Sequence, residues 1–163
     1  MIGGDAFRVK KFSSSANLSG DILVGGILEE YYLEGDDAGS TFLTSFLYML
    51  KTSDCSVSWS YEFANITTDA QPQVAWSYDE KYAYMIGNSE SSDGSEYLVI
   101  MKDPQMTMPF EDQGGPDIYG LRTGVDSTPL ESNGLFGHPY NNYQLILVRE
   151  TAIELIQPYP AIS

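Results

Sequence analysis

The stretch VAWSYDEKYAYMIGN, residues 74–88, carries the clearest strand pattern of the chain. Aromatic, β-branched and other apolar residues lie on both sides of Asp79-Glu80, which provides a polar connection of two residues. The later run EYLVIMKD, residues 96–103, is more evenly apolar, as is typical of a central strand. These segments therefore predict a three-stranded antiparallel meander over residues 73–103.

This meander resembles one blade of a β-propeller. The similarity consists of Trp76-Ser77 at a strand end, Asp79 in the turn, the Lys81-Tyr82 pair and the apolar run Ala83 to Ile86. A propeller contains several such units at a fixed period, and this sequence contains one. We therefore interpret the meander as sheet scaffold. A length of 163 residues suits a single domain.

Residues 40–51, STFLTSFLYMLK, depart from the β pattern. Their apolar positions fall at i, i+1, i+4, i+5 and i+8, namely Phe42, Leu43, Phe46, Leu47 and Leu50. We predict one short helix here, with a fully buried strand as the alternative because Thr, Phe and Tyr also suit sheets. The fold predicted for the whole chain is mostly β, an antiparallel sandwich or small barrel with this one helix.

Residues 104–142 form a Pro/Gly-rich segment that still contains many apolar side chains. Because long segments of this kind are often functional, we predict an extended excursion that packs against its own domain or against another subunit. Residues 13–163 are assigned to a single β-rich domain. Residues 1–12 are assigned to an N-terminal arm or an edge strand.

The charge is strongly acidic, with a formal net value of −15. Clustered basic residues occur only near the N-terminus, at Arg8, Lys10 and Lys11. An acidic body repels nucleic acid and anionic lipid, so neither is predicted as a partner. The basic segment is interpreted as a solvated strand, or alternatively as an arm that docks on the acidic surface of another copy.

Residues suited to catalysis or metal binding are few. The chain has one histidine, His138, and one cysteine, Cys55, which cannot form a nucleophilic triad or a standard zinc site. We predict no catalytic residue, metal or cofactor. Glu90, Asp93 and Glu96 could share a calcium ion, although a solvated acidic turn is the favoured interpretation.

Aromatic residues alternate with polar ones in SVSWSYEF, residues 56–63. Trp59, Tyr61 and Phe63, together with Trp76, could stack on sugar rings, but such a face is more often the core side of a strand. The favoured function is a non-enzymatic structural or assembly protein, such as a virion component that decorates a capsid or joins a tail or neck. The alternative is a carbohydrate- or calcium-binding β-sandwich module.

The assembly hypothesis predicts contacts with copies of the same chain and with a larger assembly. The residues predicted to contact partners are basic or apolar: Arg8, Lys10, Lys11, Met106, Met108, Phe110, Leu135 and Phe136. The N-terminal sequence lacks the apolar run of a signal peptide, and no stretch reaches the length of a membrane helix. The expected location is cytoplasmic, with incorporation into a virion as part of the hypothesis.

Overall fold

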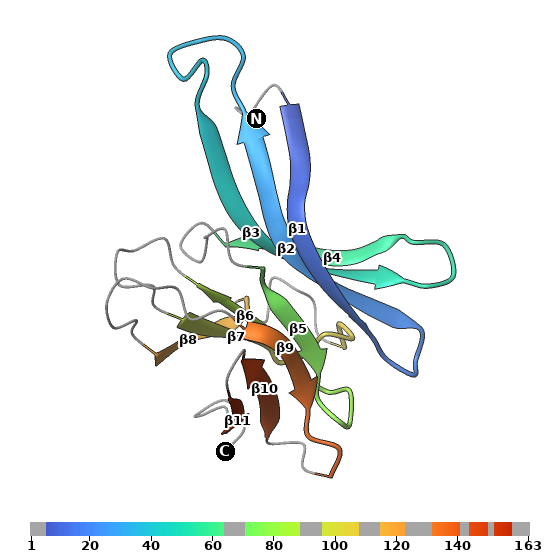
Figure 1. The fold of residues 1–163 in the computed structure, drawn as a ribbon. Helices are drawn as coiled ribbons and strands as arrows, with labels where there is room; N and C mark the ends of the chain where they lie inside the picture. The colour runs from blue at the N-terminus through green and yellow to red at the C-terminus, as the bar shows by residue number, and fades with distance from the viewer. Residues whose placement is uncertain are drawn as a thin grey trace.

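In the computed structural model, the chain is mostly β and its sheets are antiparallel (Figure 1). The structure describes residues 6–63, 71–88, 96–107, 115–122, 132–140, 144–149 and 152–157. Sheet A has the order β1-β2-β3-β4 and consists of β1 (Ala6–Ala16), β2 (Asp21–Tyr31), β3 (Thr41–Lys51) and β4 (Val57–Phe63). The predicted mostly β fold with antiparallel sheets is confirmed.

Sheets B and C follow in chain order. Sheet B has the order β5-β6-β7-β8 and consists of β5 (Gln73–Trp76), β6 (Ala83–Asn88), β7 (Glu96–Met101) and β8 (Asp117–Arg122). Sheet C has the order β11-β10-β9 and consists of β9 (Ser132–Gly137), β10 (Leu145–Arg149) and β11 (Ile153–Ile156). The predicted meander is confirmed as β5, β6 and β7, and β8 extends it.

The three sheets stack as three layers with sheet B in the middle. One core cluster joins sheet A to sheet B and contains Leu23, Leu47 and Trp59 on one side and Met85 and Val99 on the other. A second cluster joins sheet B to sheet C, and it includes Tyr84, Ile86, Ile100, Leu135, Leu145 and Leu147. Because both faces of sheet B are covered, all residues of β6 are buried. Propeller blades surround a central channel instead of stacking as flat layers.

The predicted helix at residues 40–51 is wrong. Residues 41–51 form β3, which pairs with β2 over its whole length and with β4 from Ser45 to Leu50. Side chains of β3 are apolar on both faces of the sheet, with Leu47 in the core and Phe46 on the opposite face. A strand that is apolar on both faces lacks the period of two, and its residues happened to fit a helical spacing.

The strand boundaries correct the predicted connection between β5 and β6 and add detail to the predicted excursion at residues 104–142. The connection between β5 and β6 is longer than the predicted Asp79-Glu80, because the Ser77 N–H donates to the Tyr82 carbonyl and Glu80 has a positive φ of 61°. The described parts of the excursion at 104–142 include β8 and β9, which pair with β7 and β10. This segment therefore contributes strands to two sheets.

Paired glycines in β2 allow the neighbouring layers to approach closely. A Cβ on Gly25 would lie 2.4 Å from Cγ1 of Val74, so sheet B contacts the backbone of sheet A at this point. On the opposite face, a Cβ on Gly26 would lie 2.6 Å from Cζ of Phe46, whose ring crosses the strand there. Strand glycines often mark such close approaches.

Candidate interaction surfaces

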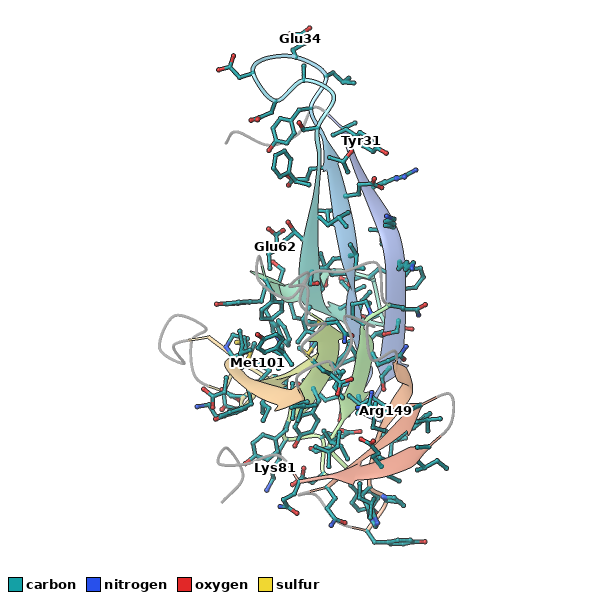
Figure 2. All side chains as sticks on the ribbon, turned by 60° about the vertical axis from the view of Figure 1, so that its left-hand side comes forward. Tyr31, Glu34, Glu62, Lys81, Met101 and Arg149 are labelled. Atoms are coloured by element: carbon teal, nitrogen blue, oxygen red, sulfur yellow. The ribbon has the colours of Figure 1, made fainter. Side chains whose placement is uncertain are left out.

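Half of sheet A projects beyond the two cores, and we call this part the extension (residues 6–9 and 28–44). It contains one end of each of β1, β2 and β3 together with the loop 32–40 (Figure 1). Figure 2 shows Tyr31 and Glu34 at its far end, well separated from Met101 and Arg149 in the body. Of the side chains described in the extension, only Glu29 is buried.

The buried carboxylate of the extension is paired with a basic residue of β1. Nε of Arg8 donates to Oε2 of Glu29 at 2.5 Å, and the Arg8 guanidinium lies 5.6 Å from the centre of the Tyr31 ring. This hydrogen bond from Arg8 lowers the pKa of the Glu29 carboxyl below its ordinary value. The pair holds β1 against β2, and it leaves Glu29 ionised and unsuited to act as a general acid.

A hollow of about 620 Å³ lies on the extension. Its lining residues come from all three strands and the loop: Lys10, Glu29, Glu30, Tyr32, Thr41, Phe42, Leu43 and Thr44. The Tyr32 and Phe42 rings pack edge to face with their centres 5.2 Å apart. β4 pairs with β3 from Ser45 onward, so among the described strands residues 41–44 pair only with β2 and form an edge of sheet A beside the hollow. A sheet edge next to aromatic side chains suits contact with another polypeptide.

Sheet C presents an apolar face to solvent, which we call the C face (Gly134, Phe136, Ile146, Val148, Ile153 and Leu155). The strand register places these residues opposite one another, with Ile146 between Phe136 and Leu155. The exposed fractions are 56% for Phe136, 74% for Ile153 and 63% for Leu155. No charged residue lies among these six positions, which is unusual for a surface facing water.

The outward face of sheet A is also apolar over much of its area. We call its apolar side chains the A face: Val9, Phe12, Ile22, Val24, Leu28, Phe42, Phe46, Tyr48 and Leu50. Phe46 is itself buried, at 3% exposed, beneath this face. Phe12 is 59% exposed and Val9 is 53% exposed. The two outer layers of the described stack therefore both present apolar side chains away from the cores.

The side chains predicted to contact partners lie in different places. Arg8, Lys10 and Lys11 lie on β1, which pairs with β2 along the edge of sheet A, and Phe136 belongs to the C face. The prediction for Leu135 is corrected, because this side chain is 4% exposed and packs in the core between sheets B and C. Met106 packs partly buried against the other core. Met108 and Phe110 lie outside the described residues.

The aromatic residues considered as a sugar platform are core residues. Trp59, Phe63 and Trp76 are buried between sheets A and B, and Tyr61 packs partly buried against them. The indole N–H of Trp59 donates to the Pro104 carbonyl at 2.8 Å, and that of Trp76 donates to the Ser15 carbonyl at 2.9 Å. Since buried indoles normally find such partners, the favoured interpretation of this strand face as core is confirmed.

The calcium hypothesis loses one of its three carboxylates. Glu96 is completely buried and accepts two hydrogen bonds from Arg149, at 2.9 and 2.7 Å, so both of its oxygens are engaged. Glu90 and Asp93 lie outside the described residues. Within the described ranges, no group of three or more His, Cys, Asp or Glu residues could hold a metal ion.

Local contacts occupy His138, whereas Cys55 is an exposed thiol. Nδ1 of His138 accepts a hydrogen bond from the Tyr140 N–H at 3.1 Å. This contact closes the turn after β9, next to the His138 N–H that donates to the Gln144 carbonyl. Cys55 is free and exposed and has a positive φ of 58° in the turn between β3 and β4.

The sequence interpretation did not identify Ile153 and Leu155 as surface residues. Their alternation with Glu154 would ordinarily place Glu154 in water and the apolar pair in the core. In the structure the orientation is reversed, because Nε of Arg149 forms an ion pair with Oε1 of Glu154 at 3.3 Å on the inner side. Alternation alone therefore separates the residues of β11 into two faces, but it does not show which of these faces is directed to the core.

Among the described residues, there is no helical segment with the length and apolar character that a membrane crossing requires.

Comparisons with protein families and with curated proteins provide no assignment for these surfaces. A scan against protein-family models matches no family, and a search of curated proteins finds no relative of this chain.

Proposed function

We propose that this chain is a non-enzymatic structural protein that assembles with copies of itself and takes part in a larger assembly. A virion component, such as a capsid decoration or a tail or neck protein, is the specific form of this proposal. It acts through contacts between subunits and requires no cofactor.

The C face is the observation that carries the proposal. Three large apolar side chains, Phe136, Ile153 and Leu155, are each more than half exposed on one sheet face. Contiguous exposed apolar residues on a soluble domain mark sites of protein contact, because covering them removes apolar surface from water. Three strands of about five residues cover roughly 14 by 17 Å, which is less than a stable isolated dimer normally buries. Such a small face suits one contact among several in a repeated assembly.

Two further features support the proposal. The extension offers a sheet edge and a hollow at a distance from the C face, so one copy can contact more than one neighbour (Figure 1). The net charge of −15 would keep unassembled copies apart in solution and disfavour unspecific association. By contrast, no observation on the described residues favours the carbohydrate- or calcium-binding alternative.

The test is the mass of the purified chain in solution, measured by light scattering over a range of concentrations. We expect the wild type to form species larger than a dimer, and we expect Leu155→Lys to reduce their mass. Leu18→Lys introduces the same charge at a fully exposed position in the turn between β1 and β2, so it serves as the matched control. A wild type whose mass is unaffected by Leu155→Lys would contradict a role for the C face.

A further inference from the structure

We propose that the A face binds a second copy of this chain, so that two copies stack sheet A against sheet A around a two-fold axis. This inference rests on the proposed function and specifies one partner and one surface. It concerns the face of sheet A that is directed away from sheet B, whereas the C face lies on the other outer layer (Figure 1).

The area of the A face matches what a stable dimer requires. The outward side of sheet A consists of three strands of 11 residues and one of seven, and at a spacing of about 4.8 Å and a rise of about 3.4 Å per residue it covers roughly 650 Å². Standard interfaces bury about 800 Å² on each partner. The C face covers only about a third of that area by the same measure. The two faces therefore suit different kinds of contact.

The composition of the A face also resembles the centre of an interface. Aromatic side chains gather there: the Phe46 ring, only 3% exposed, crosses Gly26 with its centre 4.8 Å from that of Tyr48, and Phe12 on the neighbouring strand is 59% exposed. Aromatic residues are enriched and charges depleted in interface cores. The carboxylates at outward strand positions are Glu30 and Glu62, at the margins of the sheet, in a chain with 23 acidic residues.

The low charge of this face favours a second copy over a partner of another kind. A strongly basic partner would be matched by clustered carboxylates, and an acidic partner by clustered Lys and Arg, but neither cluster occurs among the outward side chains that the register defines. In a contact with two-fold symmetry, both partners contribute the same patch, so a charged patch would face like charges on the other copy. A nearly neutral apolar sheet face avoids this repulsion, even though the whole chain is acidic.

The experiment separates this inference from the proposed function by combining variants. In the Leu155→Lys background, where the C face is blocked, we expect a dimer with about twice the chain mass of 18.0 kDa. Adding Phe12→Lys should convert this dimer to a monomer and raise its dissociation constant at least tenfold. Adding Leu18→Lys instead should leave the dimer intact. Light scattering gives the mass, and circular dichroism checks that each variant is folded.

A second variant tests the same surface without removing an apolar contact. Ser60 is exposed and lies opposite Tyr48 on the outward side of β4, so Ser60→Lys places a charge inside the face. It should weaken the dimer as Phe12→Lys does. A Leu155→Lys chain that is already monomeric would overturn the inference while leaving the role of the C face intact. A dimer that persists with both Phe12→Lys and Ser60→Lys would also overturn it.

Discussion

Sheet B and the extension of sheet A are made of similar strand-forming residues, but they are stabilised in different ways. Every residue of β6 is buried because sheets A and C cover both faces of sheet B. In the extension, Glu29 is the only buried side chain among those described, and no second layer of described strands packs there. The number of covering layers, and not strand propensity, thus separates the buried strands of sheet B from the exposed strands of the extension.

The largest effect is expected at the ion pair that joins sheets B and C. Arg149→Leu would leave the buried Glu96 carboxylate without its two hydrogen bonds, which should cost about 3–5 kcal/mol of unfolding free energy. Denaturant unfolding measures this loss. The double variant Glu96→Leu with Arg149→Leu should recover part of it. In the extension, Arg8→Leu should have a much smaller effect, because Arg8 is 60% exposed. Equal losses at both sites would contradict the difference in stabilisation between sheet B and the extension.

Two leucines of β3 allow the comparison to be made within one strand. Leu47 is completely buried in the core between sheets A and B, whereas Leu43, four residues away on the same face, lies half-buried in the extension. We expect Leu47→Ala to cost about 2–5 kcal/mol and Leu43→Ala about 1 kcal/mol or less. Thermal unfolding of both variants gives the ranking. A larger loss for Leu43→Ala would indicate that the extension is packed as tightly as the body.

The close approach of sheets A and B at Gly25 predicts a smaller effect. A Cβ there would overlap Val74, so Gly25→Ala should cost about 1–3 kcal/mol through overpacking. Val74→Ala in the same chain should relieve part of this cost. Gly120→Ala in β8 is the control, because no atom lies within 4 Å of its added Cβ. The free energy of unfolding is measured in urea. Equal losses for Gly25→Ala and Gly120→Ala would contradict the close approach of sheets A and B at Gly25.

The smallest effect is expected in the stability of the protein at acidic pH. Burial by itself would raise the pKa of Asp21, but hydrogen bonds from Lys51, Gln105 and Asn17 hold this pKa below its ordinary value. A lowered pKa contributes stability above the unfolded pKa of about 3.9, and that contribution is lost as the pH falls through the folded value. Between about pH 5 and pH 3, the wild type should therefore lose more stability than Asp21→Asn. Parallel pH profiles for the two proteins would show that Asp21 is not the group responsible.

The predictions from sequence succeeded where a strand has one apolar side or where strand-forming residues flank a polar connection. The alternating Trp59 and Phe63 were recognised because one covered face imposes a period of two. Residues 73–103, which are covered on both faces, were recognised from the strand-forming residues on both sides of Asp79-Glu80. The prediction failed for β3, because apolar side chains on both of its faces removed the period of two and left a spacing that matched a helix. For the same reason, the sequence did not indicate that sheet B is covered on both sides.

The candidate surfaces were predicted only in part. Phe136 was identified because a proline- and glycine-rich segment with apolar residues suggested contacts with other chains, and it is exposed. Its neighbour Leu135 was grouped with it, but adjacent residues of a strand point to opposite faces, and Leu135 lies in the core. Ile153 and Leu155 were missed because their orientation depends on Arg149 and Glu154, which meet only after sheets B and C have stacked.

The β-rich class, the acidic net charge and the positions of most strands can be read from the sequence, because these depend on composition and on patterns within a few residues. The sequence favoured a core position for Trp59 and Trp76, but the tertiary structure was needed to show that Phe12, Ile153 and Leu155 face outward. Burial is a property of the layers that cover a strand, and those layers come from segments far apart in the chain. An apolar side chain therefore indicates a preference for burial. The stacking of the sheets shows whether the chain itself covers that side chain or leaves it exposed for contact with another copy, as we propose.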